Sequence, residues 1–234
     1  MNAGQKSGSL SSLVSGLNRR VSRSDDGRPR IGGEARPPAA DSAETVCTST
    51  ILAKFLSLVF AQPAAELVDL GPVIGSNITF LGERIGCKIH VEDLYADLDD
   101  HARQGALDRF PEFLERRFPL PDESVDAVLG WDIFDYLSPG AATVLAGELT
   151  RVLRPGGALL GFFSGGGPDD RRYIKYVIED EAHLRCRFYA GACSRGRVLQ
   201  NRDIHDLFTG LELFGSVLLK SGVREVLFRK PAET

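Results

Sequence analysis

The sequence has few residues that form disulfides or bind metals. Its 234 positions include four cysteines and four histidines, with one tryptophan and one methionine. The cysteines are Cys47, Cys87, Cys186 and Cys193. They stand in no spacing typical of zinc sites, and the histidines are scattered along the chain. We therefore expect no metal site, and we interpret the thiols as reduced cysteines of a cytoplasmic protein.

Long apolar runs and a strong charge imbalance are also lacking. The longest candidate for a membrane span is interrupted by Lys54, Gln62 and Pro63, so no span is expected. The formal net charge is −4, which argues against a dedicated nucleic-acid-binding protein. Without a membrane-length apolar run the protein is expected to be soluble, and its length predicts one full-sized domain with an appendage.

The appendage is predicted at the start of the chain. Residues 1–45 are rich in serine, glycine, proline and arginine and poor in large apolar side chains. This composition predicts a disordered arm in front of a single domain, residues 46–234. Apolar residues between positions 10 and 21 nevertheless recur at helical spacing beside arginines. A targeting presequence and a partner-binding helix are therefore alternatives to a solvated tail.

The domain is organised around one stretch, ELVDLGPVIGSN. Its apolar run ends at Asp69, passes Gly71 and Gly75, and opens onto Ser76 and Asn77, which are good helix N-caps. The pattern predicts a buried strand, a tight turn and a helix whose first N–H groups face that turn. Open α/β sheets bind their ligands at such junctions.

The remaining pattern predicts an α/β fold. Helices are expected at 48–60, 77–84, 99–118, 139–153 and 201–208, and strands at 66–70, 88–93, 125–129, 158–163, 183–188, 211–219 and 223–228. Asp99 and Asp100 are interpreted as helix caps, as are Ser138 and Asn201. The last two strands form a hairpin. We therefore predict a Rossmann-like, doubly wound sheet that is mostly parallel, with one antiparallel C-terminal strand.

Three motifs carry a family resemblance. Val68-Asp69-Leu70-Gly71 followed by Gly75 resembles the first motif of class I S-adenosylmethionine-dependent methyltransferases, acid-x-Gly-x-Gly-x-Gly, in a degenerate form. FPLPDESVDAVL (118–129) is similar to the family's approach to its fourth strand, and ELTRVLRPGG (148–157) is similar to its helix-to-strand reversal. The resemblance covers about residues 48 to 230 and identifies the chain as similar to methyltransferase type 11-like domains.

The resemblance implies S-adenosylmethionine as cofactor and methyl transfer to a small-molecule or protein acceptor. It assigns Asp69, Gly71 and Gly75 to the methionine end, Glu92 or Asp93 to the ribose, and Gly130 and Trp131 to the nucleoside. A carboxylate suits the ribose because its two oxygens accept hydrogen bonds from both hydroxyls. The sequence does not choose between Glu92 and Asp93.

Two departures from the family pattern keep a second interpretation open. Val73 stands where the middle glycine is usual, so either the loop follows another path or the pocket is partly filled. Leu114 stands where the acid that binds the adenine amino group is usual. The alternative is a catalytically inactive methyltransferase-fold scaffold that binds a partner. Filling of the crevice by the protein's own side chains would favour that alternative.

Candidate acceptor contacts follow the fourth and fifth predicted strands of the family pattern. The favoured interpretation of Asp132 is the N-cap of the next turn. The functional interpretation places Asp132 and Tyr136 in the substrate pocket, near the transferred methyl group. By analogy with the family, the insertion at 164–200 shapes the acceptor pocket, which makes Tyr173 and Tyr176 candidate contacts. Several arginines in this insertion suit an anionic acceptor, although a solvated basic face is the commoner explanation.

Overall fold

The computed structural model describes residues 44–165 and 171–232, apart from the side chains of residues 84 and 85. The expected arm, residues 1–45, lies outside the described residues except for Glu44 and Thr45. These two residues begin the first strand, β1 (Glu44–Thr48). None of the described helices is long and apolar enough to cross a bilayer.

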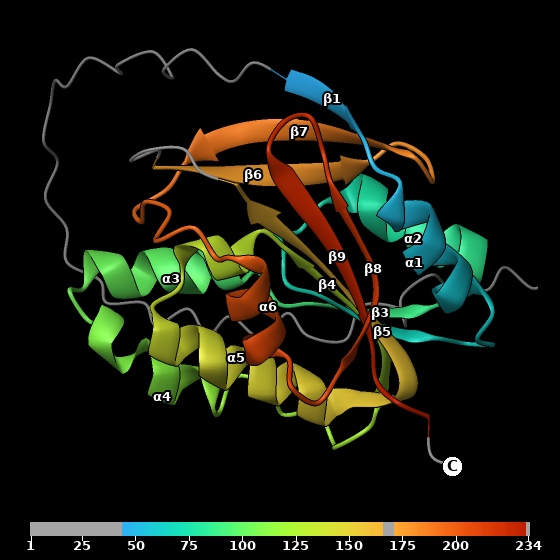
Figure 1. Cartoon of the computed structure of the whole chain (residues 1–234), viewed down its shortest axis with the longest axis horizontal. Coiled ribbons are helices and arrows are strands. Elements are labelled where there is room, and N and C mark those ends of the chain that lie inside the picture. Colours follow the sequence, from blue (N-terminus) through green and yellow to red (C-terminus); the bar gives the residue numbers. More distant parts are fainter. Residues whose placement is uncertain (1–43, 166–170, 233–234) are drawn as a thin grey trace, which may run out of the picture.

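The centre of the fold is a six-stranded sheet in the order β3-β2-β4-β5-β9-β8 (Figure 1). Its strands are β2 (Glu66–Asp69), β3 (Lys88–Val91), β4 (Val125–Trp131), β5 (Leu153–Ser164), β8 (Glu212–Leu218) and β9 (Val223–Arg229). The strands β3, β2, β4 and β5 pair in parallel, whereas β9 is antiparallel to both β5 and β8. The predicted mostly parallel sheet with one antiparallel C-terminal strand is confirmed.

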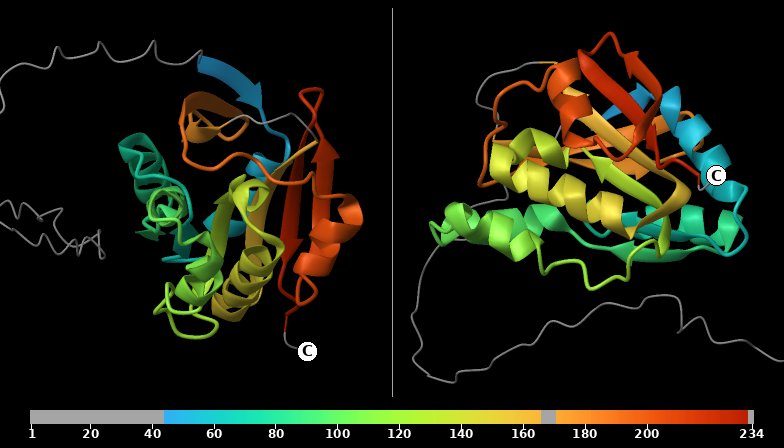
Figure 2. Two further views of the ribbon diagram at one scale, coloured as in Figure 1. Left: turned by 90° about the vertical axis from the view of Figure 1, so that its left-hand side faces the viewer. Right: turned by 60° about the horizontal axis from the view of Figure 1, so that its bottom comes forward.

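Helices cover both faces of this sheet, as Figures 1 and 2 show. They are α1 (Ile51–Phe60), α2 (Gly75–Ile85), α3 (Leu94–Arg103), α4 (Phe110–Leu114), α5 (Pro139–Val152) and α6 (Asn201–Leu207), with short 3-10 turns η2 (Leu107–Arg109) and η3 (Ile133–Tyr136). One buried apolar cluster contains residues of α1 and α2, and another contains residues of α3 to α6. The doubly wound prediction is therefore confirmed.

A second sheet was not predicted. Strands β6 (Arg172–Ile178) and β7 (His183–Ala190) pair with each other, and β1 pairs with β7 in the order β1-β7-β6. This sheet lies above the large one in the orientation of Figure 1. Its residues come from the predicted insertion and from the segment next to the arm. The sequence predicted the strand at 183–188 but not its partners.

The Asn77 side chain fastens the second sheet to the first. Its Nδ2 donates to the Tyr176 carbonyl at 2.8 Å, and its Oδ1 accepts from the Ile178 N–H at 2.8 Å. Strand β6 pairs only with β7 among the described strands, so the Asn77 amide serves the free edge of β6 as a neighbouring strand would. The prediction that Asn77 or Ser76 caps the helix is wrong, because α2 already begins at Gly75.

Other helix starts also differ from the predicted caps. Helix α3 begins directly after β3, and its N-cap is Asp93, so Asp99 and Asp100 lie within the helix. Helix α6 is capped by Gln200 in a capping box, and Asn201 is its first residue. The predicted cap at Ser138 is confirmed, since its side chain accepts from the Ala141 N–H.

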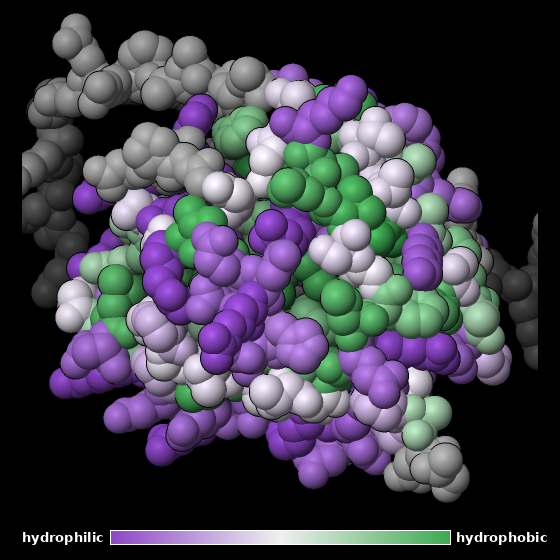
Figure 3. Space-filling model, viewed as in Figure 1, coloured by the Kyte–Doolittle hydropathy of each residue, from purple (hydrophilic) through white to green (hydrophobic). Residues whose placement is uncertain are grey.

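One face of the molecule carries exposed apolar side chains over the β8–β9 hairpin (Figure 3). On the edge strand β8, Leu213 is 53% exposed, Leu218 is 61% exposed and Phe214 is 37% exposed. The hairpin itself was predicted from the short glycine turn between its strands.

Candidate functional site

The carboxyl edge of the large sheet joins Asp69 to Trp131. Strand β2 ends at Asp69, and the neighbouring strand β4 ends at Trp131. The Asp69 Oδ1 accepts from the Gly71 N–H at 2.9 Å and from the Trp131 Nε1–H at 2.6 Å. Both bonds go to the same oxygen, so a single carboxylate atom holds the glycine turn and the indole together.

Asp69 is a buried acid that forms no ion pair with the described residues. The residue is 4% exposed. Burial raises its pKa from the ordinary 3.8 to about 6, although the hydrogen bonds from Trp131 and Gly71 act in the opposite direction. The site therefore contains a carboxyl group that changes its charge near pH 6.

The Trp131 ring fills the space beside the glycine turn. A Cβ placed on Gly71 would lie 2.8 Å from the indole, which is closer than real side chains approach. The indole stacks on Tyr176 with ring centroids 5.1 Å apart and planes 7° apart, and it meets the edge of Phe162. Trp131 itself is 2% exposed and has a φ of +48°, in the left-handed region that costs a non-glycine residue energy.

As they stand, these residues do not fit the cofactor that the resemblance implies. The indole occupies the space next to Gly71, where the methionine end was expected, and Tyr176 covers the other face of the ring. Val73 is not the obstacle, because this residue is 59% exposed. Gly75 has open space around it and begins α2.

The two candidate ribose acids face different ways. The carboxylate of Glu92 forms an ion pair with Arg117, whose guanidinium also donates to the Glu92 carbonyl at 2.6 Å. Asp93 has a φ of +41°, and its side chain accepts from the Ala96 N–H at 3.3 Å at the start of α3. The sequence missed Arg117, which has no motif signal. Leu114 is fully buried in the core through α4.

Asp132 is the centre of a buried polar cluster. Its carboxylate accepts from the Tyr95 hydroxyl at 2.6 Å, from the Arg195 guanidinium at 2.8 Å and from the Tyr136 hydroxyl at 3.4 Å. The residue stands at the predicted N-cap position of η3, but its side chain makes no cap bond there, so the capping interpretation is wrong. The sequence predicted Asp132 and Tyr136 and counted Arg195 among the arginines of the insertion, yet it missed Tyr95 and the pairing of Arg195 with Asp132.

The two candidate tyrosines of the insertion lie on β6 and are both buried. The Tyr173 hydroxyl accepts from the Cys193 N–H at 3.2 Å, and its ring meets the Tyr136 ring edge-on at 4.8 Å. Tyr176 stacks on Trp131 instead. Gly130 lies one residue before Trp131, where a Cβ would come within 3.2 Å of the Leu160 carbonyl oxygen. Most of the predicted site residues thus lie close together, and their side chains pack against one another.

Comparison with known proteins supports the resemblance. The family model described as a methyltransferase domain matches residues 68–161. Residues 68–161 are thus similar to the methyltransferase-domain family, and the sheet has the class I order with one antiparallel C-terminal strand. This family's reaction is methyl transfer from S-adenosylmethionine, and the acceptor of this methyltransferase domain is not identified. No curated protein matches the chain.

Solved structures with a similar chain trace include three methyltransferases. A putative sarcosine dimethylglycine methyltransferase from Galdieria sulphuraria is 18% identical, with 79% of this chain and 85% of that chain covered and a TM-score of 0.48. The 1,6-didemethyltoxoflavin-N1-methyltransferase of Burkholderia thailandensis, solved with S-adenosylhomocysteine, is 17% identical (78% and 77% covered, TM-score 0.49). A methyltransferase from Aquifex aeolicus is 17% identical (76% and 88% covered, TM-score 0.45).

Proposed function

We propose that this domain transfers a methyl group from S-adenosylmethionine to an acceptor that is a small molecule or a protein, and that Trp131 has to leave its place beside Gly71 before the cofactor binds. The observation that carries the proposal is the family match at residues 68–161. It includes the end of the strand at Asp69, the glycine turn and the 148–157 reversal. We also propose a cytoplasmic location, on the composition of the chain.

Methyl transfer asks little acid–base chemistry of the protein. The sulfonium cofactor supplies an electrophilic methyl group, and holding an acceptor in line with it provides much of the acceleration. The absence of a nucleophile–base pair from the predicted site residues is therefore compatible with this reaction. In this proposal Asp93 accepts hydrogen bonds from the ribose, and the β6 tyrosines, Tyr173 and Tyr176, line the acceptor pocket.

A second candidate function is favoured by one specific observation, the filled space beside Gly71. The indole of Trp131 is bonded to Asp69, stacked on Tyr176 and almost completely buried. A side chain with this many buried contacts stabilises the fold, so its removal from the crevice costs free energy. If cofactor binding does not offset the free energy of moving Trp131, the domain is a methyltransferase-shaped scaffold that binds a partner without the cofactor.

Calorimetric titration of the full chain with S-adenosylmethionine and S-adenosylhomocysteine separates these functions. Micromolar binding that is lost in the Glu92→Ala/Asp93→Ala double variant supports the methyltransferase. No heat with millimolar ligand, in the wild type or in Trp131→Ala, supports the scaffold. Phe162→Ala is the matched control, since it removes a buried ring next to Trp131 without opening the space at Gly71.

A further inference from the structure

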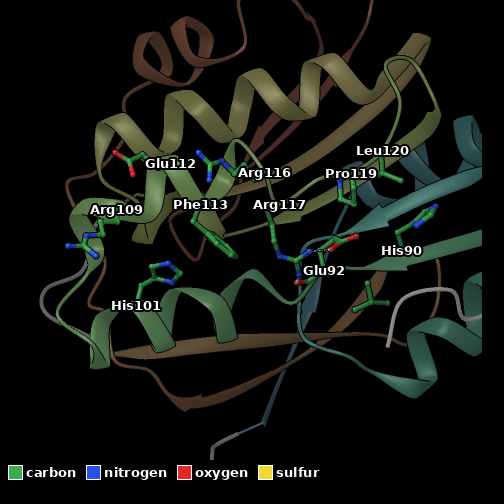
Figure 4. Close-up of a pocket in the computed structure, with 11 residues that line it drawn as sticks. His90, Glu92, His101, Arg109, Glu112, Phe113, Arg116, Arg117, Pro119 and Leu120 are labelled. Carbon is green, nitrogen blue, oxygen red and sulfur yellow. Dashed lines mark hydrogen bonds and ion pairs between the residues drawn. The ribbon is translucent and has the colours of Figure 1, made fainter. Parts of the chain in front are cut away.

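A cleft of about 600 Å³ lies outside the Asp69–Trp131 site, between α3, α4 and strand β3 (Figure 4). Its volume is within the range of small-molecule sites. Strand β3 is an edge strand of the large sheet, and it pairs with β2 alone among the described strands. The segment after α4, which leads to β4, forms the opposite wall. The cleft therefore occupies the side of the sheet where no further described strand covers β3.

The cleft has guanidinium groups in two different states. Arg117 is fixed, because its Nε donates to the Asp97 Oδ2 at 2.8 Å and its guanidinium is paired with Glu92. Arg109 and Arg116 border the same cleft, are exposed, and pair with no carboxylate among the described residues. Arginines without a protein partner keep all their donors available for an anionic ligand.

An apolar surface lies next to these arginines. The ring of Phe113 packs against the His101 imidazole with centroids 4.8 Å apart, and Figure 4 shows both rings between Arg109 and the Glu92–Arg117 pair, with Arg116 on the side of Glu112. The His101 Nδ1–H donates to the Asp97 carbonyl at 2.8 Å, which leaves Nε2 for a second contact. Glu112 also borders the cleft, so its exposed charged groups are two unpaired guanidinium groups and one carboxylate.

We propose that this cleft binds a small organic phosphate. The phosphate group is held by Arg109 and Arg116, whose planar forks match its oxygens, and the organic part lies on Phe113. The fixed Arg117–Glu92 pair is the inner wall, because its donors are already used. This site is separate from the proposed methyltransferase function and does not depend on it: only Glu92 touches both regions.

The test is calorimetric titration of the full chain with phenyl phosphate, inorganic phosphate and benzoate. We expect phenyl phosphate to bind with a Kd below about 1 mM. The Arg109→Ala/Arg116→Ala double variant should weaken this binding by at least about tenfold, since two charge-assisted contacts are lost. Phe113→Ala should weaken phenyl phosphate and leave inorganic phosphate unchanged. Arg202→Ala, which removes an arginine that is 92% exposed on α6, should change nothing.

Four outcomes would overturn the proposal. The first is no heat from phenyl phosphate up to about 10 mM, a concentration at which even weak sites are filled. The second is unchanged affinity in the double arginine variant. The third is benzoate binding as tightly as phenyl phosphate, which would assign the cleft to carboxylates. Phenyl phosphate binding that is lost in Trp131→Ala would also contradict a separate site, whereas loss of S-adenosylmethionine binding alone leaves the proposal intact.

Discussion

The indole Nε1–H of Trp131 donates to the Asp69 Oδ1 over 2.6 Å, and this bond closes the glycine turn of the methyltransferase domain. The hydrogen-bond acceptor, Asp69, is the acid of the first motif at the end of β2. The donor, Trp131, is the last residue of β4, which lies beside β2 in the sheet. A side chain of the protein thus satisfies the group that the resemblance assigns to the cofactor. One buried carboxylate therefore joins the ends of two neighbouring strands through its hydrogen bonds.

The charge of Asp69 should make the stability of the fold depend on pH. Its folded-state pKa, about 6, is above the ordinary 3.8, so between these values the folded protein binds more protons than the unfolded chain. The free energy of unfolding therefore falls as the pH rises from about 4 to about 6. Asp69→Asn keeps an oxygen for both hydrogen bonds and removes the charge. Relative to wild type, its stability should rise over this range by up to about 3 kcal/mol.

Urea unfolding of both proteins at several pH values measures this difference. Asp135 also has a raised pKa, about 7, because of its burial and the nearby Asp132. It titrates in both proteins, so its contribution cancels. A stability difference between Asp69→Asn and wild type that stays constant from about pH 4 to about pH 7 would show that the carboxyl is not perturbed.

Asn77 should be required for the second sheet to stay on the first. Asn77→Ala leaves the Tyr176 carbonyl and the Ile178 N–H without their partner at the edge of β6. Each unsatisfied buried group costs about 1–3 kcal/mol, so we expect a loss of roughly 2–5 kcal/mol in urea unfolding. The Ile178 amide should also exchange with solvent faster in hydrogen-exchange experiments. Asn201→Ala, an exposed change on α6, is the control; equal stability of both variants would refute the clamp.

The large sheet could be predicted because its signals are local. The glycine turn after Asp69, the Pro155-Gly156-Gly157 reversal and the terminal hairpin each lie within a few residues of the structure that they cause. The second sheet has no such signal. Strand β1 finds its partner where Thr45 lies opposite Cys186, far along the chain. Such pairing depends on long-range packing, which period and composition do not encode.

The site was only half predictable for the same reason. Asp69, Gly71 and Trp131 stand at the ends of strands, so topology alone brings them together. The space beside Gly71 is filled by the Trp131 ring, on which Tyr176 of the second sheet stacks. In the same way, Asp132 looked like a helix cap because its partly buried partner Arg195 has no motif around it. Residues that approach from unpredicted elements decide the local chemistry here.

The ion pair of Arg195 with Asp132 should show strong coupling in a double-mutant cycle. The Asp132 side chain is 3% exposed and the Arg195 side chain is 20% exposed, with 2.8 Å between their charged groups. Arg195→Met leaves a buried charge without compensation, so it should cost roughly 3–5 kcal/mol. Arg195→Met/Asp132→Asn should recover part of this loss. Thermal and urea unfolding of the four proteins measure it, and additive losses would mean that the two charges do not interact.

The thiols of Cys47 on β1 and Cys186 on β7 lie 3.2 Å apart. They are free thiols in this structure, and their strands are neighbours in the second sheet. Burial raises the pKa of the Cys186 thiol, and Cys47 is the less buried of the two, so a small disulfide reaches Cys47 more easily. Cys47 is therefore the expected nucleophile toward a small disulfide, with Cys186 as the thiol that completes the exchange.

Oxidised glutathione at mildly alkaline pH should convert this pair into a disulfide. The Cys47 thiolate displaces one glutathione thiolate to give a mixed disulfide; Cys186, after losing its proton, displaces the second glutathione. The protein loses two hydrogens in total, which intact mass spectrometry detects. Because the bond closes a loop of more than a hundred residues, unfolding should become harder by up to about 5 kcal/mol. Cys87→Ser and Cys193→Ser should oxidise as wild type does, whereas Cys186→Ser should stop at the mixed disulfide. Accumulation of the mixed disulfide in wild type would show that the two sulfur atoms cannot reach bonding geometry.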